Sequence, residues 1–253
     1  MTAPMLELKG VTKVFGGVTA VREVNMSVRA RTITAVIGPN GAGKTSLFNV
    51  ATGFEEPTKG NVLFQGEDVT GLEPWRVARK GLIRTFQTPT GFPALSVWEN
   101  LMVGGTSDRD ESLLGALRGV WHTGESITNE RARQVLTDLG LWDRRDILLA
   151  DLSPGDVKVV DFARQLMAEP KMVLLDEPAS GVDPGSIDRL GNVIRRVREQ
   201  GVTVLVIDHN IGFVLGIADQ VHVMSLGQVI ASGTPDQVVR DPMVIETYLG
   251  RSA

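Results

Sequence analysis

The octapeptide GPNGAGKT at residues 38–45 constrains this chain more than any other stretch. It matches the pattern G-x-x-x-x-G-K-[ST] and lies between a β-branched run and a helical segment, KTSLFNVATG, that ends at Gly53. Glycines let backbone N–H groups converge on phosphate oxygens, and the start of the following helix adds positive potential. We call residues 38–45 the phosphate loop, and in this context they predict an α/β fold that binds a nucleotide.

Each part of the phosphate loop has an expected task. The Lys44 ammonium is expected to reach the β- and γ-phosphates, and the Thr45 hydroxyl to bind Mg²⁺. The other expected nucleotide-binding residues of the loop are Gly38, Pro39, Asn40, Gly41, Ala42 and Gly43. The alternative is a glycine-rich turn before a helix, but a chance match in a chain of this length has a frequency on the order of 1%.

The hydrophobic pattern divides the chain into three kinds of segment. Residues 5–37 alternate apolar and polar side chains, which predicts short strands. Residues 88–150 begin with a loop-like sequence and continue with apolar residues at helical spacing. After residue 150 the apolar runs KMVLLD and VTVLVID are separated by a helix, and continuous apolar runs are typical of buried parallel strands. We therefore predict an α/β core with an antiparallel N-terminal sheet and a helical insert.

Composition excludes several classes of protein and site. The chain has 253 residues, no cysteine and a formal net charge of −4, so disulfides and thiolate zinc sites are excluded and nucleic acid is not the expected partner. No apolar run approaches the roughly 18–20 residues of a membrane span, and the start lacks the apolar stretch of a signal peptide. These features predict a cytosolic chain that can dock on a membrane protein.

Two acidic residues follow the apolar run MVLL, where a buried strand is expected to leave the sheet. Open α/β sheets bind ligands at this edge. Asp176 is expected to hold the metal ion, directly or through water, and Glu177 to polarise an attacking water. The alternative is that both carboxylates only cap the next helix.

Three further motifs make the interpretation specific. LSPGD at residues 152–156 precedes a helix, DEPASGVDP occupies residues 176–184, and VLVIDHN carries His209 after a strand. Together with the phosphate loop they resemble the ABC transporter ATPases, over essentially the whole chain. The resemblance implies one ATPase domain, with a RecA-like core and antiparallel sheet in residues 1–87 and 166–253 and a helical subdomain in residues about 88–165.

The resemblance also implies roles for residues outside the phosphate loop. Phe15 matches the aromatic residue that stacks on adenine, and Gln87 matches the glutamine that senses the nucleotide, contacts the metal and assists catalysis. His209 would contact the γ-phosphate and act with Glu177 in catalysis, and Asp183 would contact nucleotide. The alternatives are an ordinary polar loop residue at Gln87 and an ordinary core or surface histidine at His209.

The LSPGD motif corresponds to the signature loop, which in this family closes over the nucleotide of a second subunit. Ser153 and Gly155 would meet the γ-phosphate there. Pro154 lacks an N–H donor, Asp156 replaces the usual glutamine, and Lys158 lies near a common arginine position. Because an acidic side chain close to triphosphate would oppose closure, we expect Asp156 to slow the partner's site in an asymmetric heterodimer.

The sequences near the two ends of the chain indicate a subfamily. FGGVTAV and GQVIASGTPDQVVRDPMVIETYLG resemble the ATPases of branched-chain amino acid importers, and ATPases of urea or short-amide importers are similar. The resemblance implies an ATP- and Mg²⁺-dependent ATPase on the cytoplasmic side of the plasma membrane. Its partners would be membrane permease subunits, reached through the surface around Gln87 to Asn100, a second ATPase subunit of the same or another sequence, and, indirectly, an extracytoplasmic solute-binding protein.

Two other classes remain as alternatives. A regulatory ABC protein acting on ribosomes or DNA typically has two ATPase domains or a long coiled-coil insert, whereas this chain has one phosphate loop and neither of those features. A P-loop kinase would not need the LSPGD and VIDHN motifs.

Overall fold

The computed structural model describes residues 4–85, 90–105 and 121–249. The chain forms two compact units, which we describe separately. The sheet unit comprises Met1–Gln87, Lys171–Ser180 and Val197–Ala253, and the helical unit comprises Thr88–Pro170 and Gly181–Arg196. None of the helices built from the described residues has both the length and the hydropathy that a membrane crossing requires.

The first sheet of the sheet unit is antiparallel and has the strand order β2-β1-β4-β5. Its strands are β1 (Leu6–Phe15), β2 (Val18–Val28), β4 (Lys59–Phe64) and β5 (Glu67–Asp68). Gly16 and Gly17 have φ angles of 49° and 93°, and this conformation turns β1 into β2 at little steric cost. The alternating pattern in residues 5–37 thus forms the β1–β2 hairpin before the chain enters the second sheet.

The second sheet has the order β10-β9-β3-β8-β7-β6 and is parallel except for its β9–β10 hairpin. Its strands are β3 (Ile33–Ile37), β6 (Leu82–Arg84), β7 (Met172–Asp176), β8 (Thr203–Ile207), β9 (Gln220–Ser225) and β10 (Gln228–Gly233). Every residue of β3, β7 and β8 is buried, which explains their continuous apolar sequences. The predicted α/β fold with an antiparallel sheet is confirmed.

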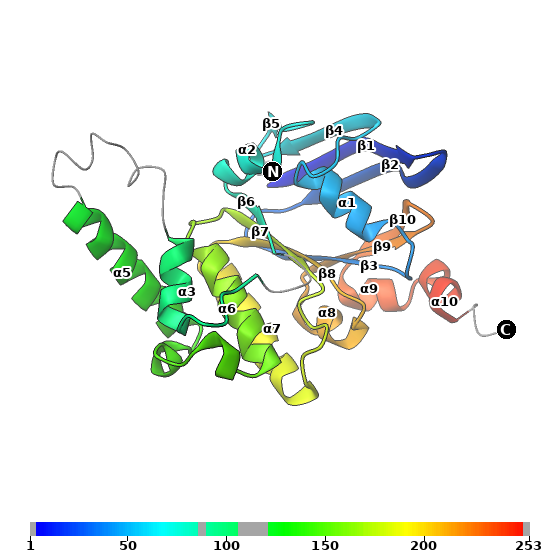
Figure 1. The fold of residues 1–253 in the computed structure, drawn as a ribbon. Helices are drawn as coiled ribbons and strands as arrows, with labels where there is room; N and C mark the ends of the chain where they lie inside the picture. Colours follow the sequence, from blue (N-terminus) through cyan, green and yellow to red (C-terminus); the bar gives the residue numbers. More distant parts are fainter. Residues whose placement is uncertain (1–3, 86–89, 106–120, 250–253) are drawn as a thin grey trace. The chain divides into compact units, whose positions relative to one another are not determined.

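Helix α1 (Lys44–Ala51) runs between the two sheets (Figure 1). One cluster of buried apolar side chains joins it to both, and its members include Leu6, Leu8 and Val62 from the first sheet, Leu47 and Phe48 from α1, and Leu174 and Leu205 from the second. The remaining helices of this unit are α2 (Pro74–Arg79), α8 (Ile211–Ile217), α9 (Pro235–Val239) and α10 (Pro242–Leu249). Burial of this cluster fixes the helix that begins within the phosphate loop.

The helical unit contains α3 (Val97–Gly104), α5 (Trp121–Asp138), α6 (Pro154–Leu166) and most of α7 (Pro184–Glu199). Short 3₁₀ turns occupy Trp142–Arg144 and Leu149–Asp151. The division expected from the sequence assigned residues 166–170 and 181–196 to the core, whereas the structure groups them with this unit. Arg189 and Arg196 of α7 donate to the backbone carbonyls of Gly140 and Asp138, which attaches α7 to the helical insert.

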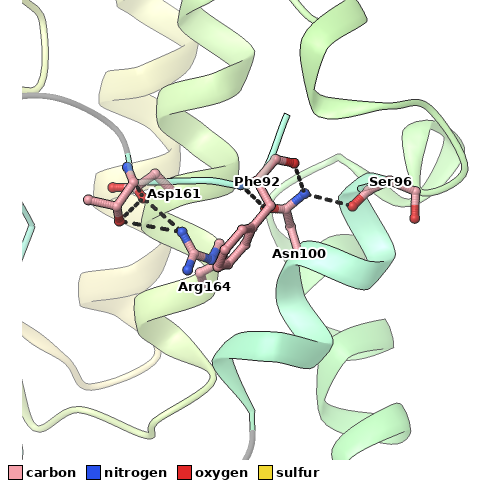
Figure 2. A network of polar contacts seen from close by, with 6 residues as sticks. Phe92, Ser96, Asn100, Asp161 and Arg164 are labelled. Atoms are coloured by element: carbon pink, nitrogen blue, oxygen red, sulfur yellow. Dashed lines mark hydrogen bonds and ion pairs between the residues drawn. The ribbon is translucent and has the colours of Figure 1, made fainter. Parts of the chain in front are cut away.

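A buried amide closes the loop before α3 (Figure 2). The fully buried Asn100 donates through Nδ2 to the carbonyls of Phe92, Leu95 and Ser96 at 3.1, 3.1 and 2.9 Å. Its Oδ1 accepts from the Phe92 N–H at 2.8 Å. A single side chain thus satisfies four backbone groups of a loop that has no regular structure of its own.

A second contact holds the same loop to α6. The Asp161 carboxylate accepts from the Thr90 N–H at 3.1 Å and pairs with Arg164 at 3.3 Å (Figure 2). The Arg164 guanidinium also lies over the Phe92 ring, 5.3 Å from its centroid. The segment proposed for permease contact, in its described part, is therefore fixed by buried polar bonds.

Replacement of Asn100 by alanine should lower the free energy of unfolding by about 2–4 kcal/mol, because buried backbone groups lose their partners. Urea denaturation measures this change. The matched control is Asn192→Ala, an exposed asparagine on α7, for which we expect a change within about 0.5 kcal/mol. Equal effects at the two positions would contradict the structural role of Asn100.

Candidate functional site

The phosphate loop leaves the second sheet at the end of β3 in a conformation that depends on glycine. Gly41 and Gly43 have φ angles of 79° and 98°. A Cβ atom on Gly43 would lie 2.2 Å from the Ala20 carbonyl oxygen, so no side chain fits there. Gly43 is also the N-cap of α1 and makes no side-chain cap bond, which leaves the helix start to bind an anion through its backbone.

The β9–β10 turn supports the phosphate loop from the side. The Gly227 N–H donates to the Ala42 carbonyl at 3.0 Å, and the Arg22 N–H donates to the Gly227 carbonyl at 2.8 Å. Gly227 has a φ angle of 82°, and a Cβ there would lie 2.9 Å from the Ala20 carbonyl oxygen. The loop is thus bonded to a turn nearly two hundred residues later in the sequence.

The Lys44 amine lies inside the loop. Lys44 is 8% exposed, and its Nζ donates to the carbonyls of Gly38 at 2.8 Å and Pro39 at 3.0 Å. Burial lowers the pKa of Lys44, and the charges of Glu177 and Asp176 act in the opposite direction. The ammonium and the two carboxylates therefore lie close enough to interact at one end of the sheet.

Sheet order explains why these groups meet. β3 and β7 lie on either side of β8, and all three strands run parallel. Val36 and Asp176 are both in register with Ile207, the last residue of β8. The phosphate loop, the Asp176–Glu177 pair and the Asp208–His209 pair consequently leave the same carboxyl edge, where open α/β sheets bind ligands.

Glu177 and His209 face one another across this edge. The His209 Nδ1 atom lies 3.8 Å from a Glu177 carboxylate oxygen, and the His209 side chain is 58% exposed. Glu177 adopts a φ angle of 50°, an uncommon left-handed conformation, while its N–H donates to the Ile207 carbonyl at 2.8 Å. Such strained residues cluster at functional sites.

A buried carboxylate that the sequence reasoning left without a role connects the two loops. Asp208 is completely buried, and its oxygens accept from the N–H groups of Ala179 and Asn210, both at 2.8 Å. These bonds fix the segment after Glu177 to the segment that carries His209. An aspartate directly after an apolar strand was the available signal.

Asp176 has a partner that the sequence reasoning also missed. Arg84, at the end of β6, donates to Asp176 Oδ2 at 2.6 Å and to Asn49 Oδ1 at 2.6 Å. The Arg84 and Asp176 side chains are only 7% and 8% exposed. The signal for Arg84 was a cation at the end of an apolar strand, but the identity of its partner depends on the pairing of β6 with β7.

The protein groups expected at the metal are few. Among the described residues, no group of three or more histidine, aspartate or glutamate side chains could hold a metal ion. Asp176 and the exposed Thr45 remain as oxygen donors. This set fits Mg²⁺, which is usually bound by one or two protein ligands together with waters and substrate phosphates.

Two further residues expected at the site are Phe15 and Gln87. Phe15, at the end of β1, is 41% exposed, and the Lys13 ammonium lies 4.8 Å from its ring centroid. The ring is therefore accessible for stacking. Gln87 lies outside the described residues.

The expected signature residues begin α6 in the helical unit. Ser153 is the N-cap of this helix, and Pro154 occupies the first turn, where its missing N–H removes no intrahelical bond. Gly155 packs so closely against α7 that a Cβ would lie 3.1 Å from the Ser186 Cβ. Asp183 accepts from the Ser186 N–H at 3.1 Å, and its bonds with Ser186 lower the pKa of the Asp183 carboxyl. Ser186 thus links the signature loop to the Asp183 loop.

Asp156, which we expected to oppose closure over a triphosphate, carries a carboxylate that is already paired with cations. The residue is 7% exposed, and its carboxylate pairs with both Arg144 and Arg189. Both of its cationic partners come from other segments of the helical unit. The sequence did not reveal this because the partners come from a 3₁₀ turn and from α7, and only folding places them beside α6.

Family models match two parts of the chain. A model described as ABC transporter matches residues 21–180, and one described as branched-chain amino acid ATP-binding cassette transporter matches residues 228–253. The high-affinity branched-chain amino acid transport ATP-binding protein BraF of Pseudomonas aeruginosa is 37% identical over the full length of both chains. A probable branched-chain amino acid transport ATP-binding protein of Methanocaldococcus jannaschii is 36% identical, with 98% of each chain covered.

Solved structures agree with these sequence relatives. A nucleotide-free ATP-binding cassette from an ABC transporter is 37% identical, superposes with a TM-score of 0.84, and covers 97% of this chain and 99% of its own. An ATP-binding cassette in its ADP conformation gives a TM-score of 0.87 at 37% identity, with 99% of this chain and 100% of the other covered. On these likenesses and on the residues gathered around the phosphate loop, the chain belongs to the ABC transporter family, as an ATP-binding cassette ATPase.

Proposed function

We propose that this chain is the ATP-hydrolysing subunit of an importer for branched-chain amino acids. The observation that carries the proposal is the common carboxyl edge of β3, β8 and β7, at which Lys44, Glu177 and His209 meet. The substrate class is supported by the C-terminal match at residues 228–253 and by the names of the full-length relatives.

The residues at this edge divide the work of phosphoryl transfer to water. Backbone N–H groups of the phosphate loop and the Lys44 ammonium bind the phosphates and offset their charge. Glu177 orients and polarises the attacking water, and His209, within reach of Glu177, contacts the γ-phosphate side. Catalysis of this kind consists mostly of positioning and charge stabilisation.

The Mg²⁺ ion belongs to the proposal. Bound with the nucleotide, it would neutralise charge on the β- and γ-phosphates. Thr45 and Asp176 would hold it, with Gln87 as a third contact. Arg84 keeps the Asp176 carboxylate in a fixed orientation through a buried bond, so this metal-binding carboxylate is positioned before nucleotide binds.

The proposed assembly follows from where the two sets of site residues lie. Ser153, Gly155 and Asp183 belong to the helical unit and would act on nucleotide held by a second ATPase subunit. The described residues 90–100 of the helical unit would contact the permease at the cytoplasmic face of the membrane. ATP binding would favour a closed pair of ATPases, and hydrolysis would open it.

Replacement of Glu177 by glutamine should leave ATP binding intact and lower ATP hydrolysis by at least about a hundredfold, because the group that polarises the water is lost. Phosphate release by the purified transporter measures hydrolysis. Glu199→Gln, at an exposed glutamate on α7, is the matched control and should keep full turnover. Retained turnover in the Glu177 variant would refute its role.

Replacement of Lys44 by alanine should instead weaken nucleotide binding by at least about tenfold, because one charge-assisted phosphate contact is worth about 1.5–3 kcal/mol. Equilibrium titration of the isolated chain with a fluorescent ATP analogue measures the affinity. Lys59→Ala, at an exposed lysine of β4, should bind like the wild type. Wild-type affinity in the Lys44 variant would mean that residues 38–45 are not the phosphate site.

Deletion of the chain from its host should reduce uptake of radiolabelled leucine, isoleucine and valine. Expression of the wild-type chain should restore uptake, and expression of the Glu177→Gln variant should not. Unchanged uptake of these amino acids together with impaired uptake of urea or short amides would reassign the substrate and leave the ATPase role in place.

A further inference from the structure

The Asp156 carboxylate lies at the centre of a cluster made from three segments of the helical unit. Arg144, in the 3₁₀ turn, pairs with Oδ2, and Arg189, on α7, donates to Oδ1 at 2.5 Å. The Ser153 hydroxyl donates to Oδ2 at 2.8 Å. Both carboxylate oxygens are therefore engaged, and one acidic side chain joins the signature loop to two arginines that are distant in the sequence.

The Asp156 carboxylate is more deeply covered than its two cationic partners. The Asp156 side chain is 10% exposed, whereas the Arg144 and Arg189 side chains are 40% and 36% exposed. The carboxylate is thus covered while parts of both guanidinium groups face solvent. The negative charge of Asp156 is therefore paired, and the carboxylate does not face solvent as an isolated aspartate would.

The same cluster fixes the hydroxyl of Ser153. Its oxygen accepts from the Asp156 N–H at 3.2 Å as the helix cap, and its O–H donates to the Asp156 carboxylate. Since both bonds run to one residue, the rotamer of Ser153 depends on the placement of Asp156. Placement of Asp156 depends in turn on the two arginines.

Packing at α7 keeps this geometry rigid. Gly155 approaches Ser186 so closely that a Cβ would meet the Ser186 side chain at 3.1 Å. Arg189 lies one helical turn beyond Ser186, on the same face of α7. The residue beside Asp156 and one of its cationic partners are therefore held by a single helix.

We propose that Asp156, Arg144 and Arg189 are positioning residues that fix the start of α6, with Ser153 and Gly155, for contact with nucleotide bound by the second ATPase subunit. This inference rests on the proposed function. At position 156 an aspartate replaces the usual glutamine, and this aspartate forms ion pairs with Arg144 and Arg189. A glutamine at position 156 could accept a bond from Ser153, but it would leave both guanidinium groups without a carboxylate. Asp156→Gln should consequently slow the transporter.

The test uses the full chain, alone and in the transporter complex purified through a tag on this chain. The variants are Asp156→Asn, Asp156→Gln, Arg144→Gln and Arg189→Gln. ATP turnover by the complex should fall at least about fivefold in each. Binding of a fluorescent ATP analogue to the isolated chain should change less than about twofold, because the chain's own phosphate loop belongs to the other unit.

A double-mutant cycle shows whether Asp156 and Arg189 act as a coupled pair or independently. In the Asp156→Asn background, Arg189→Gln should cost far less turnover than it does in the wild type, because the two residues act as a pair. Asp146→Asn is the matched control. It removes an aspartate that pairs with Arg145 at 3.3 Å but is 81% exposed, and it should leave turnover unchanged.

Three results would overturn the inference. These are higher turnover in Asp156→Gln, additive effects in the cycle, and a loss of turnover fully accounted for by a loss of folded protein in thermal melts. Failure of the proposed function has a different signature, which is the absence of ATP turnover in the wild-type complex or retained turnover in Glu177→Gln.

Discussion

Parallel pairing of β8 with both β3 and β7 is the constraint on which the nucleotide site depends. The three strands contribute the phosphate loop, the Asp176–Glu177 pair and the Asp208–His209 pair, and the phosphate loop lies more than a hundred residues before either pair. Backbone register alone brings their ends to one level, because Val36 and Asp176 both align with Ile207. Side-chain bonds such as those of Asp208 then refine an arrangement that the sheet has already imposed.

Buried charge in this molecule is matched locally. Arg84 pairs with Asp176, Arg164 with Asp161, and Asp156 with two arginines, while Lys44 binds carbonyls of its own loop. An unpaired charge in such surroundings would be costly. The pairs of Asp176 with Arg84 and of Asp156 with its two arginines join separate segments, so these contacts specify geometry more than they add stability. Catalytic groups on the sheet and signature groups on the helices are both positioned in this way.

The fold class and most of the candidate site could be predicted from the sequence because they depend on local patterns. The phosphate loop is defined by eight consecutive residues, Glu177 directly follows one apolar strand, and His209 is the second residue after another. Arg84, by contrast, lies 92 residues from Asp176, and Arg189 lies 33 residues from Asp156. Nothing in local sequence identifies such partners. For this reason the sequence predicts neither the arginine partners of Asp156 nor the attachment of α7 to the helical unit.

The contact between the β9–β10 turn and the phosphate loop bears on how the chain can be shortened or rearranged. Gly227 donates to Ala42 and leaves no room for a side chain beside Ala20. A chain cut before β9 would therefore lose a support of the nucleotide site as well as two strands of the sheet. The β9–β10 turn is thus part of the support of the phosphate loop, and a fusion or a new chain terminus should not be introduced within this hairpin.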